Sequence, residues 1–383
     1  MTIAAVSAIA FDAGFQRQAL QTTRIASPMS RWPRFAEARA SWMWPTRKAL
    51  VRVVDSDGCE GWSCTNGGEI TALIVNEQLA RIVGGADADD PAAIWSQMFH
   101  ALLPVDRSGI AGMAVAAVDI ALWDLRARRD GVALVDLLGG ARADSMACYA
   151  TTTAPEAQAG TPWWGLKAAM PWGPEGGAEG LAQNLALLRR FRAAAGPDRP
   201  IMLDAFMAWD ADYTLRIAEA AAETGLYWIE DPLPPQDMDG LRRLRAEGGE
   251  DLRLALGNFC FNRWDCKALL DEGLVDVLQP DVAWAGGITE ALEILALAEG
   301  AGVPVVLHNT CEQPWALALA AARINDPLVE FVDRGAGSEL YSLMGPPPPC
   351  TGGRIPAPVA PGLNQPPPAL AARLSDRPQP AKA

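Results

Sequence analysis

The pattern of hydrophobic and polar residues changes near the end of the first third of the chain. Before that point, residues 48–55 are strand-like, whereas residues 70–84 have helical periodicity. Residues 112–125 follow as an apolar helix that contains Asp119 and Asp124, for which we expect structural roles as caps or local pairs. The first part of the chain therefore predicts a small α+β unit.

From about residue 145 onward, short β-branched or aromatic runs alternate with helical stretches. The runs that predict eight strands span residues 146–152, 163–170, 200–206, 226–231, 253–258, 275–281, 304–309 and 328–333. Strands that alternate with helices predict a parallel sheet, and eight of them predict an α/β barrel. Beyond residue 344 the chain is rich in proline, so we expect an extended, partly docked tail with its last ~15 residues frayed.

Composition and charge narrow the class of protein. Half of the 383 residues are hydrophobic and 20% are charged, which excludes wholesale disorder. The net charge of −14 argues against nucleic acid or an anionic membrane as a partner. It also means that an anionic substrate would need a local positive centre, such as a metal ion. The seven cysteines show no zinc-site spacing, and we find neither a signal-peptide pattern nor a long apolar run, so we expect a reduced, cytoplasmic protein.

Polar residues mark the carboxyl ends of the predicted strands, where barrel enzymes place their active sites. Five consecutive strands end in residues 23 to 28 positions apart, about one strand–helix unit each: Asp204, Glu230, Asn258, Asp281 and His308. The first three offer two carboxylates and an amide oxygen, a set that suits a hard cation such as Mg²⁺. For each of them taken singly, the alternative is a cap at a strand end.

His308 is one of two histidines, and Asp281 precedes it by one strand. A carboxylate that accepts a hydrogen bond from one ring nitrogen raises the basicity of the other, as general acid–base catalysis requires. The alternative is a core histidine whose hydrogen bonds are all satisfied. His100 lies in a helical stretch, where we expect a packing or surface role.

Four stretches carry a family resemblance. Residues 116–125, AAVDIALWDL, are followed by LLGG at 137–140, and the fourth and sixth strands read Trp228-Ile-Glu-Asp-Pro232 and QPDVAWAGG at 279–287. The chain thus resembles the mandelate racemase subgroup of the enolase superfamily over nearly its whole length. The resemblance implies a modified TIM barrel, (β/α)7β, with an α+β capping domain.

The resemblance also implies domain limits and a chemistry. We expect the cap at residues 1–135, the catalytic barrel at 136–344, and a Pro-rich segment at 345–383 that returns to the cap. The family abstracts a proton α to a carboxylate with the help of Mg²⁺. Carried over by position, Asp204 and Glu230 match metal ligands, Asp281 and His308 the catalytic dyad, and Glu330 the acid that hydrogen-bonds the substrate carboxylate; a surface strand residue is the alternative for Glu330.

Two departures from the family pattern point to a dehydratase. Asn258 follows Gly257 where the family usually has a glutamate; glucarate dehydratases share this asparagine, and we expect weaker Mg²⁺ binding. The second strand reads Lys167-Ala-Ala169 instead of Lys-x-Lys, so the second base of a racemase is missing. One histidine can serve twice in a dehydratase, and the surrounding stretches resemble acid-sugar dehydratases such as L-rhamnonate dehydratases.

We therefore expect Mg²⁺-dependent dehydration of an aldonate or aldarate to a 2-keto-3-deoxy acid. The alternatives are an epimerase or cycloisomerase of the same superfamily, or an inactive member that acts as a binding protein. Lys167 would supply positive potential near the substrate carboxylate, or else be a buried lysine paired with an acid. Arg24, one of four arginines between residues 17 and 34, and Asn309 are candidate substrate ligands; for Arg24, a solvated loop position is the alternative. The family implies a homo-oligomer without fixing the number of subunits.

Overall fold

The computed structural model describes residues 1–12, 24–36, 47–332, 344, 349–363 and 365–375. The amino-terminal part forms a three-stranded antiparallel sheet in the order β1-β2-β3. Its strands are β1 (Ile3–Asp12), β2 (Arg47–Asp55) and β3 (Glu60–Thr65). β2 lies where the sequence predicts a strand.

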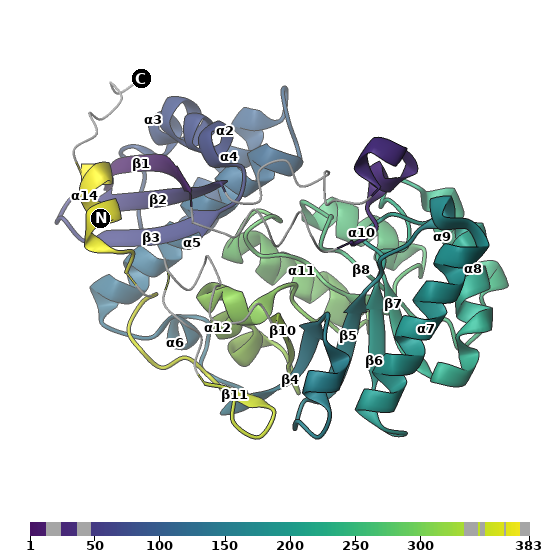
Figure 1. Ribbon diagram of the computed structural model, residues 1–383. Coiled ribbons are helices and arrows are strands. Elements are labelled where there is room, and N and C mark those ends of the chain that lie inside the picture. Colours follow the sequence, from purple (N-terminus) through teal and green to yellow (C-terminus); the bar gives the residue numbers. More distant parts are fainter. Residues whose placement is uncertain (13–23, 37–46, 333–343, 345–348, 364, 376–383) are drawn as a thin grey trace.

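Helices cover this sheet. They are α2 (Gly68–Ile74), a π-turn (Val75–Leu79), α3 (Ala80–Val83), α4 (Pro91–Leu102) and α5 (Gly109–Asp130). The short α6 (Leu134–Leu137) follows and packs against α12 (Pro314–Arg323) of the barrel. The apolar faces of β1, β2, α4 and α5 share one hydrophobic core. The predicted α+β unit is thus present, and Figure 1 shows it at one end of the molecule, with the barrel at the other.

The second sheet is parallel and curls into a barrel. Its order is β10-β4-β5-β6-β7-β8-β9, with β4 (Ser145–Thr152), β5 (Gly165–Ala169), β6 (Ile201–Asp204), β7 (Leu226–Glu230), β8 (Leu254–Leu256), β9 (Val277–Leu278) and β10 (Leu328–Val332). The predicted strand at 304–309 is reduced to a bridge between Leu278 and Val305. Side chains fill the barrel interior: Tyr149, Met202, Trp228, Ala255, Val277 and Val306.

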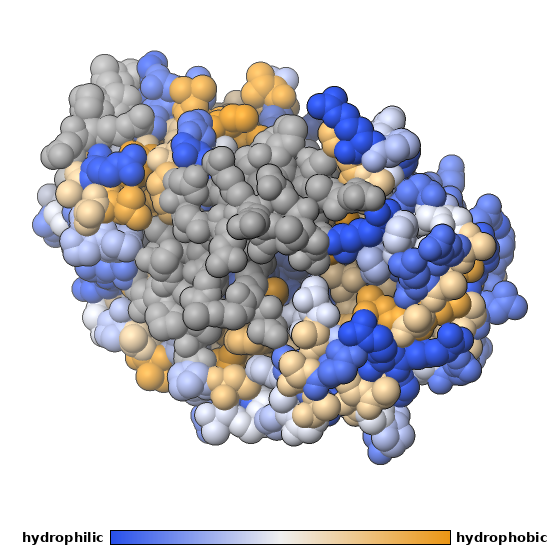
Figure 2. All heavy atoms as spheres, in the orientation of Figure 1, coloured by the Kyte–Doolittle hydropathy of each residue, from blue (hydrophilic) through white to orange (hydrophobic). Residues whose placement is uncertain are grey.

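Helices surround the barrel. They are α7 (Gly177–Ala195), α8 (Ala211–Ala220), α9 (Met238–Glu247), α10 (Arg263–Asp271), α11 (Ile288–Ala301) and α12 (Pro314–Arg323). In α9, Leu241 and Leu244 are buried, whereas Arg242 and Arg243 form exposed ion pairs. Polar residues accordingly gather over α7, α8 and α9 (Figure 2). A 3-10 helix (Pro155–Gln158) takes the place of an α-helix between β4 and β5.

The carboxyl-terminal segment runs from the barrel back to the cap. β11 (Arg354–Pro356) pairs antiparallel with β4, and α14 (Pro368–Ser375) lies beside β1 (Figure 1). The Pro-rich composition did not predict this helix. Residues 376–383, the larger part of the end expected to fray, lie outside the described residues, and the exact domain limits stay predictions.

Two carboxylates of α5 connect the cap to the barrel and to the carboxyl-terminal segment. Asp119 accepts hydrogen bonds from the backbone N–H and hydroxyl of Thr289 and so caps α11. Asp124 accepts from the backbone N–H groups of Trp62 and Leu363. The structural roles predicted for both are confirmed. Among the described residues, none of the helices combines the length and apolar character needed to cross a membrane.

Candidate active site

The candidate residues lie at the carboxyl end of the barrel strands. Asp204 and Glu230 are the last residues of β6 and β7, and Asn258 follows β8 after one glycine. Asp281 lies in the loop after β9, and the backbone N–H of His308 donates to the carbonyl of Pro280. Parallel strands bring their carboxyl ends to one edge of a barrel, so residues far apart in sequence share one region.

The proposed metal ligands are buried and present oxygens without protein partners. Glu230 Oε1 and Asn258 Oδ1 are both inaccessible to solvent and accept no hydrogen bond within the described part of the chain. A buried oxygen left in this state is costly unless a cation or water meets it. Among the described residues, no three His, Cys, Asp or Glu side chains lie close enough together to hold a metal ion. The proposed ligand set combines two carboxylates with the amide oxygen of Asn258, so it is not a group of that kind.

Asp204 completes this set. One of its oxygens accepts the backbone N–H of Phe206 at 2.9 Å. Burial, and next the negative charge of Glu230, raises the pKa of Asp204 to about 7. A nearby cation would remove this penalty, because opposite charge favours the ionised carboxyl. Two buried carboxylates and a buried amide oxygen that lacks a protein partner form a ligand set that fits Mg²⁺.

Lys167, on β5, is paired with two acids inside the barrel. Its Nζ lies 2.7 Å from Glu230 Oε2 and 2.8 Å from Glu330 Oε1, and the side chain is 1% exposed. Burial alone would lower the pKa of Lys167, but the two carboxylates outweigh it and raise the pKa well above its usual value. The structure has this lysine buried and paired with acids, and its effect on a substrate carboxylate stays a prediction.

Glu330 is buried in β10, which excludes the surface alternative. Besides Lys167, it accepts the hydroxyl of Thr151 at 2.6 Å and the backbone N–H of Asn309 at 2.7 Å. Burial would raise the pKa of Glu330, but Lys167 and His308 lower it to about 2. Glu330 is therefore ionised at neutral pH and serves as a hydrogen-bond acceptor.

His308 and Asp281 form the predicted pair. His308 Nδ1 lies 2.8 Å from Asp281 Oδ2, while the other oxygen of Asp281 accepts the backbone N–H of Ala283. Burial opposes the charged imidazolium, but the hydrogen bond and charge of Asp281 outweigh it and raise the pKa of His308. Nε2 has no hydrogen bond within the described part of the chain, and the side chain is 18% exposed. This arrangement differs from a core histidine with both nitrogens satisfied.

Asn309 adopts a left-handed backbone conformation with φ of 53°. Its Nδ2 donates to Glu312 at 2.9 Å, whereas its Oδ1 is buried without a partner among the described residues. Non-glycine residues in this conformation cost energy and occur often at functional sites. Phe206, Met207 and Asp231 share the strain, and each follows the end of β6 or β7.

The predicted substrate contact Arg24 is found just beyond the end of β5. Its Nε donates to the carbonyl of Pro171, and its guanidinium stacks 3.4 Å from the centre of the Trp172 ring. These contacts hold the arginine against a loop, so it is not a freely solvated side chain. Arg17, another arginine of this segment, lies outside the described residues.

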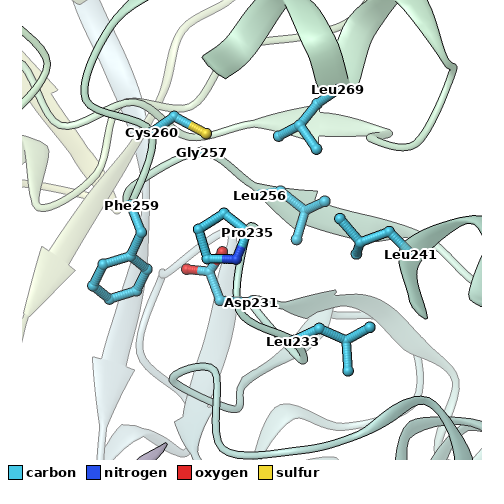
Figure 3. A pocket seen from close by; sticks show the side chains of 9 residues that line it. All are labelled: Asp231, Leu233, Pro235, Leu241, Leu256, Gly257, Phe259, Cys260 and Leu269. Atoms are coloured by element: carbon cyan, nitrogen blue, oxygen red, sulfur yellow. The ribbon is translucent and has the colours of Figure 1, made fainter. Parts of the chain in front are cut away.

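Two further buried polar groups lie in this region: Asp231, which the sequence marks as a possible ligand of substrate hydroxyls, and Gln313, to which it gives no role. Asp231 Oδ2 has no partner among the described residues, and Figure 3 shows the carboxylate in a pocket beside Gly257 and Phe259, the neighbours of Asn258. Gln313 donates to Asp281 from 32 residues away. Asp231 follows Glu230 directly, so its position was a visible signal, whereas nothing in the sequence marks Gln313.

Comparison with known proteins gives the same family in both parts of the chain. Residues 26–139 match the mandelate racemase / muconate lactonizing enzyme N-terminal domain, and residues 164–364 match the enolase C-terminal domain-like family. The L-rhamnonate dehydratase of Saccharopolyspora erythraea is 37% identical over 346 residues, which cover 89% of this chain and 88% of that protein.

Solved structures agree with the sequence matches. The rhamnonate dehydratase of Gibberella zeae complexed with Mg is 28% identical, with a TM-score of 0.88 over 97% of this chain and 96% of that chain. The L-talarate dehydratase of Polaromonas sp. JS666, complexed with Mg and L-glucarate, is 25% identical, with a TM-score of 0.74 over 97% and 96%. These likenesses confirm the predicted capped (β/α)7β barrel. The chain belongs to the mandelate racemase/muconate lactonizing enzyme family of the enolase superfamily.

Proposed function

We propose that the protein is a Mg²⁺-dependent dehydratase that converts a sugar acid, an aldonate or aldarate, into a 2-keto-3-deoxy acid. The observation that carries this proposal is the His308–Asp281 pair, at the edge of the barrel where Glu230 and Asn258 present buried oxygens without partners. The rhamnonate and talarate dehydratases among its relatives support the same reaction class.

Asp204, Glu230 and Asn258 would hold the cation. When bound, Mg²⁺ supplies positive charge for the substrate carboxylate and for the enediolate formed from it. Asn258 gives this set one negative charge fewer than a third carboxylate would. Lys167, held between Glu230 and Glu330, neutralises part of the remaining negative charge.

His308 performs both proton transfers. Because Asp281 accepts a hydrogen bond from Nδ1–H, Nε2 is the nitrogen that faces the reaction. Nε2 removes the proton from C2, the carbon next to the carboxylate; the electron pair of that C–H bond forms a C1=C2 bond while the C1=O electron pair moves onto oxygen, which gives the enediolate. The carboxylate then re-forms, the C1=C2 electron pair moves to make a C2=C3 bond, and the C3–O bond breaks as the 3-hydroxyl leaves with the proton from Nε2 as water. The resulting enol takes up a solvent proton at C3 to become the keto acid.

The replacement of the family's second lysine by alanine favours dehydration over racemisation or epimerisation. Those reactions need a proton donor on the face opposite His308. Ala169 stands where the family's second lysine would be, and Lys167 is engaged with two carboxylates. Arg24 and Asn309 are the side chains we propose to contact the distal part of the substrate.

The test is incubation of the protein and Mg²⁺ with a library of aldonic and aldaric acids, followed by trapping of keto acids and repeated in D₂O. We expect a keto acid with deuterium at C3. His308→Gln should lower turnover by roughly 10²–10⁴-fold or more while the circular dichroism stays unchanged. His100→Gln is the matched control, since His100 bonds to Ser96 on the exposed side of α4.

The other outcomes separate the alternatives. Deuterium exchange at C2 without keto acid would make the protein an epimerase. If the protein bound no Mg²⁺ and gave neither keto acid nor deuterium exchange with any sugar acid tested, the inactive member that acts as a binding protein would be favoured. The partner we propose is a small-molecule carboxylate in a cytoplasmic setting, and the predicted homo-oligomer is checked by sedimentation of the purified chain.

A further inference from the structure

Gln313 lies behind the catalytic pair. Its side chain is buried at 3% exposure, at the start of α12. Its Nε2 donates to Asp281 Oδ2 at 2.9 Å, the same oxygen that lies 2.8 Å from His308 Nδ1. One carboxylate oxygen thus receives two side-chain donors, one from the base and one from Gln313.

Trp315 sets the orientation of the Gln313 amide. The indole Nε1–H lies 2.7 Å from Gln313 Oε1. An indole nitrogen can only donate a hydrogen bond, so the amide oxygen must face Trp315 and the NH₂ group must face Asp281. Because Trp315 is fully buried, the amide cannot turn over without leaving that N–H unpaired.

A hydrogen-bond donor at this position weakens Asp281 as an acceptor for His308 and so limits how far Asp281 raises the basicity of the imidazole. Each hydrogen bond to a carboxylate stabilises its charge and weakens it as an acceptor for other donors. Asp281 already accepts the backbone N–H of Ala283 on its other oxygen. The Gln313 amide therefore competes with the imidazole for the negative charge on Oδ2.

We propose that Gln313, anchored by Trp315, is a positioning residue that fixes the Asp281 carboxylate and moderates the basicity of His308. This inference rests on the proposed role of His308 as the base. The residue adds a neutral hydrogen bond and no charge. It therefore lowers the basicity of His308 without changing the number of charges around the imidazole.

Other charged groups also act on His308. Asp281 faces it from the loop after β9, Glu330 from β10 and Glu230 from β7. Lys167 on β5 pairs with the last two. All of them are retained when Gln313 is replaced, so a comparison of the variant with the parent isolates the amide.

The chain offers a direct readout, since His308 and His100 are its two histidines. Imidazole NMR signals would be followed against pH, with the His308 signal identified by its loss in His308→Gln. In Gln313→Met, which keeps the length of the side chain but removes its donor, we expect the midpoint of His308 to rise by about half to one pH unit. The acidic limb of kcat/KM should move upward by the same amount, because a more basic histidine stays protonated to higher pH. His100 is the internal control.

Trp315→Phe provides a second variant that keeps Gln313. Without the indole N–H the amide is no longer fixed, so the midpoint should move in the same direction by a smaller amount. Gln313 makes no capping bond to α12, and its replacement should leave that helix in place. A folded Gln313→Met protein with an unchanged His308 midpoint would overturn the inference.

The titration needs no substrate, so it separates the two proposals. A shifted midpoint in a protein that dehydrates no sugar acid would retain the role of Gln313 and reject the dehydratase. An active dehydratase in which the His308 midpoint does not shift would retain the proposed function and reject the role of Gln313.

Discussion

The ammonium group of Lys167 lies 2.7 Å from Oε2 of Glu230, and neither side chain is more than 1% exposed. The lysine therefore holds a proposed metal ligand by one oxygen and leaves the other, Oε1, without a partner among the described residues. This bond orients the carboxylate before any cation arrives. It also places a positive charge close to the proposed Mg²⁺ position.

Replacement of Lys167 by Met should destabilise the protein by about 3–5 kcal/mol, because Glu230 and Glu330 would be left buried without a counter-charge. Mg²⁺ should restore more stability to this variant than to the parent, because the cation would then supply the positive charge that Glu230 has lost. Urea unfolding with and without Mg²⁺ measures both effects. Lys267→Met, which removes an exposed ion pair with Asp271, is the matched control and should change little. An unchanged unfolding curve for Lys167→Met would contradict this account of the pair.

Asn258→Asp should strengthen Mg²⁺ binding by roughly tenfold, since it adds one negative charge to the ligand set with little change of shape. Asn258→Leu, which lacks the amide oxygen, should weaken binding. Titration calorimetry with Mg²⁺ alone measures both variants. Asn325→Asp makes the same chemical change at an exposed position and should leave the affinity unchanged. Equal affinities for all three variants and the parent would show that Asn258 is not a ligand.

Asp119 should make stability depend on pH. Burial raises its pKa in the folded protein to about 7, above the unfolded value of 3.8. Between these values the unfolded state releases a proton that the folded state keeps, so the free energy of unfolding falls as the pH rises from about 4 to 7, by on the order of 3–4 kcal/mol. Asp119→Asn should flatten this part of the pH dependence, since a neutral amide can accept from the Thr289 backbone and donate to its hydroxyl.

The measurement is urea unfolding at pH 5 and pH 7.5. Asp204 also titrates near neutral pH, so the result is the difference between Asp119→Asn and the parent. Asp57→Asn, at an exposed turn, controls for the loss of a carboxylate. The same pH dependence in Asp119→Asn and the parent would rule out this assignment.

Asp124→Ala should release the carboxyl-terminal segment from the cap. Asp124 accepts the backbone N–H of Leu363 and forms a buried ion pair with Arg128, which itself bonds to the Leu363 carbonyl. Its loss should cost about 3–5 kcal/mol and speed proteolysis beyond residue 350. Limited proteolysis with mass spectrometry gives the readout, with Asp271→Ala as the exposed control. A tail that stays as protected as in the parent would show that other contacts hold it.

The barrel could be predicted because its strands depend on local patterns. Runs of β-branched and aromatic residues followed by helical stretches predicted eight strands, of which seven are present and the eighth is reduced to the bridge at Val305. That segment is short and flanked by Pro304 and the strained Asn309, so its pairing depends on neighbours more than on its composition. Helix α14 escaped prediction because the prolines around it suggested an extended tail.

The candidate site was predictable to the extent that strand ends define it. Parallel topology carries Asp204, Glu230, Asn258 and His308 to one edge whatever the details of packing. By itself, the sequence determined this set of residue types, the histidine that follows Asp281 by one strand and the alanine at position 169. The tertiary structure alone decided that Lys167 pairs with Glu230 and Glu330 and that Gln313 reaches Asp281 from another loop. Such pairings depend on the curvature of the barrel and on the direction of each side chain, which arise from contacts between segments distant in sequence.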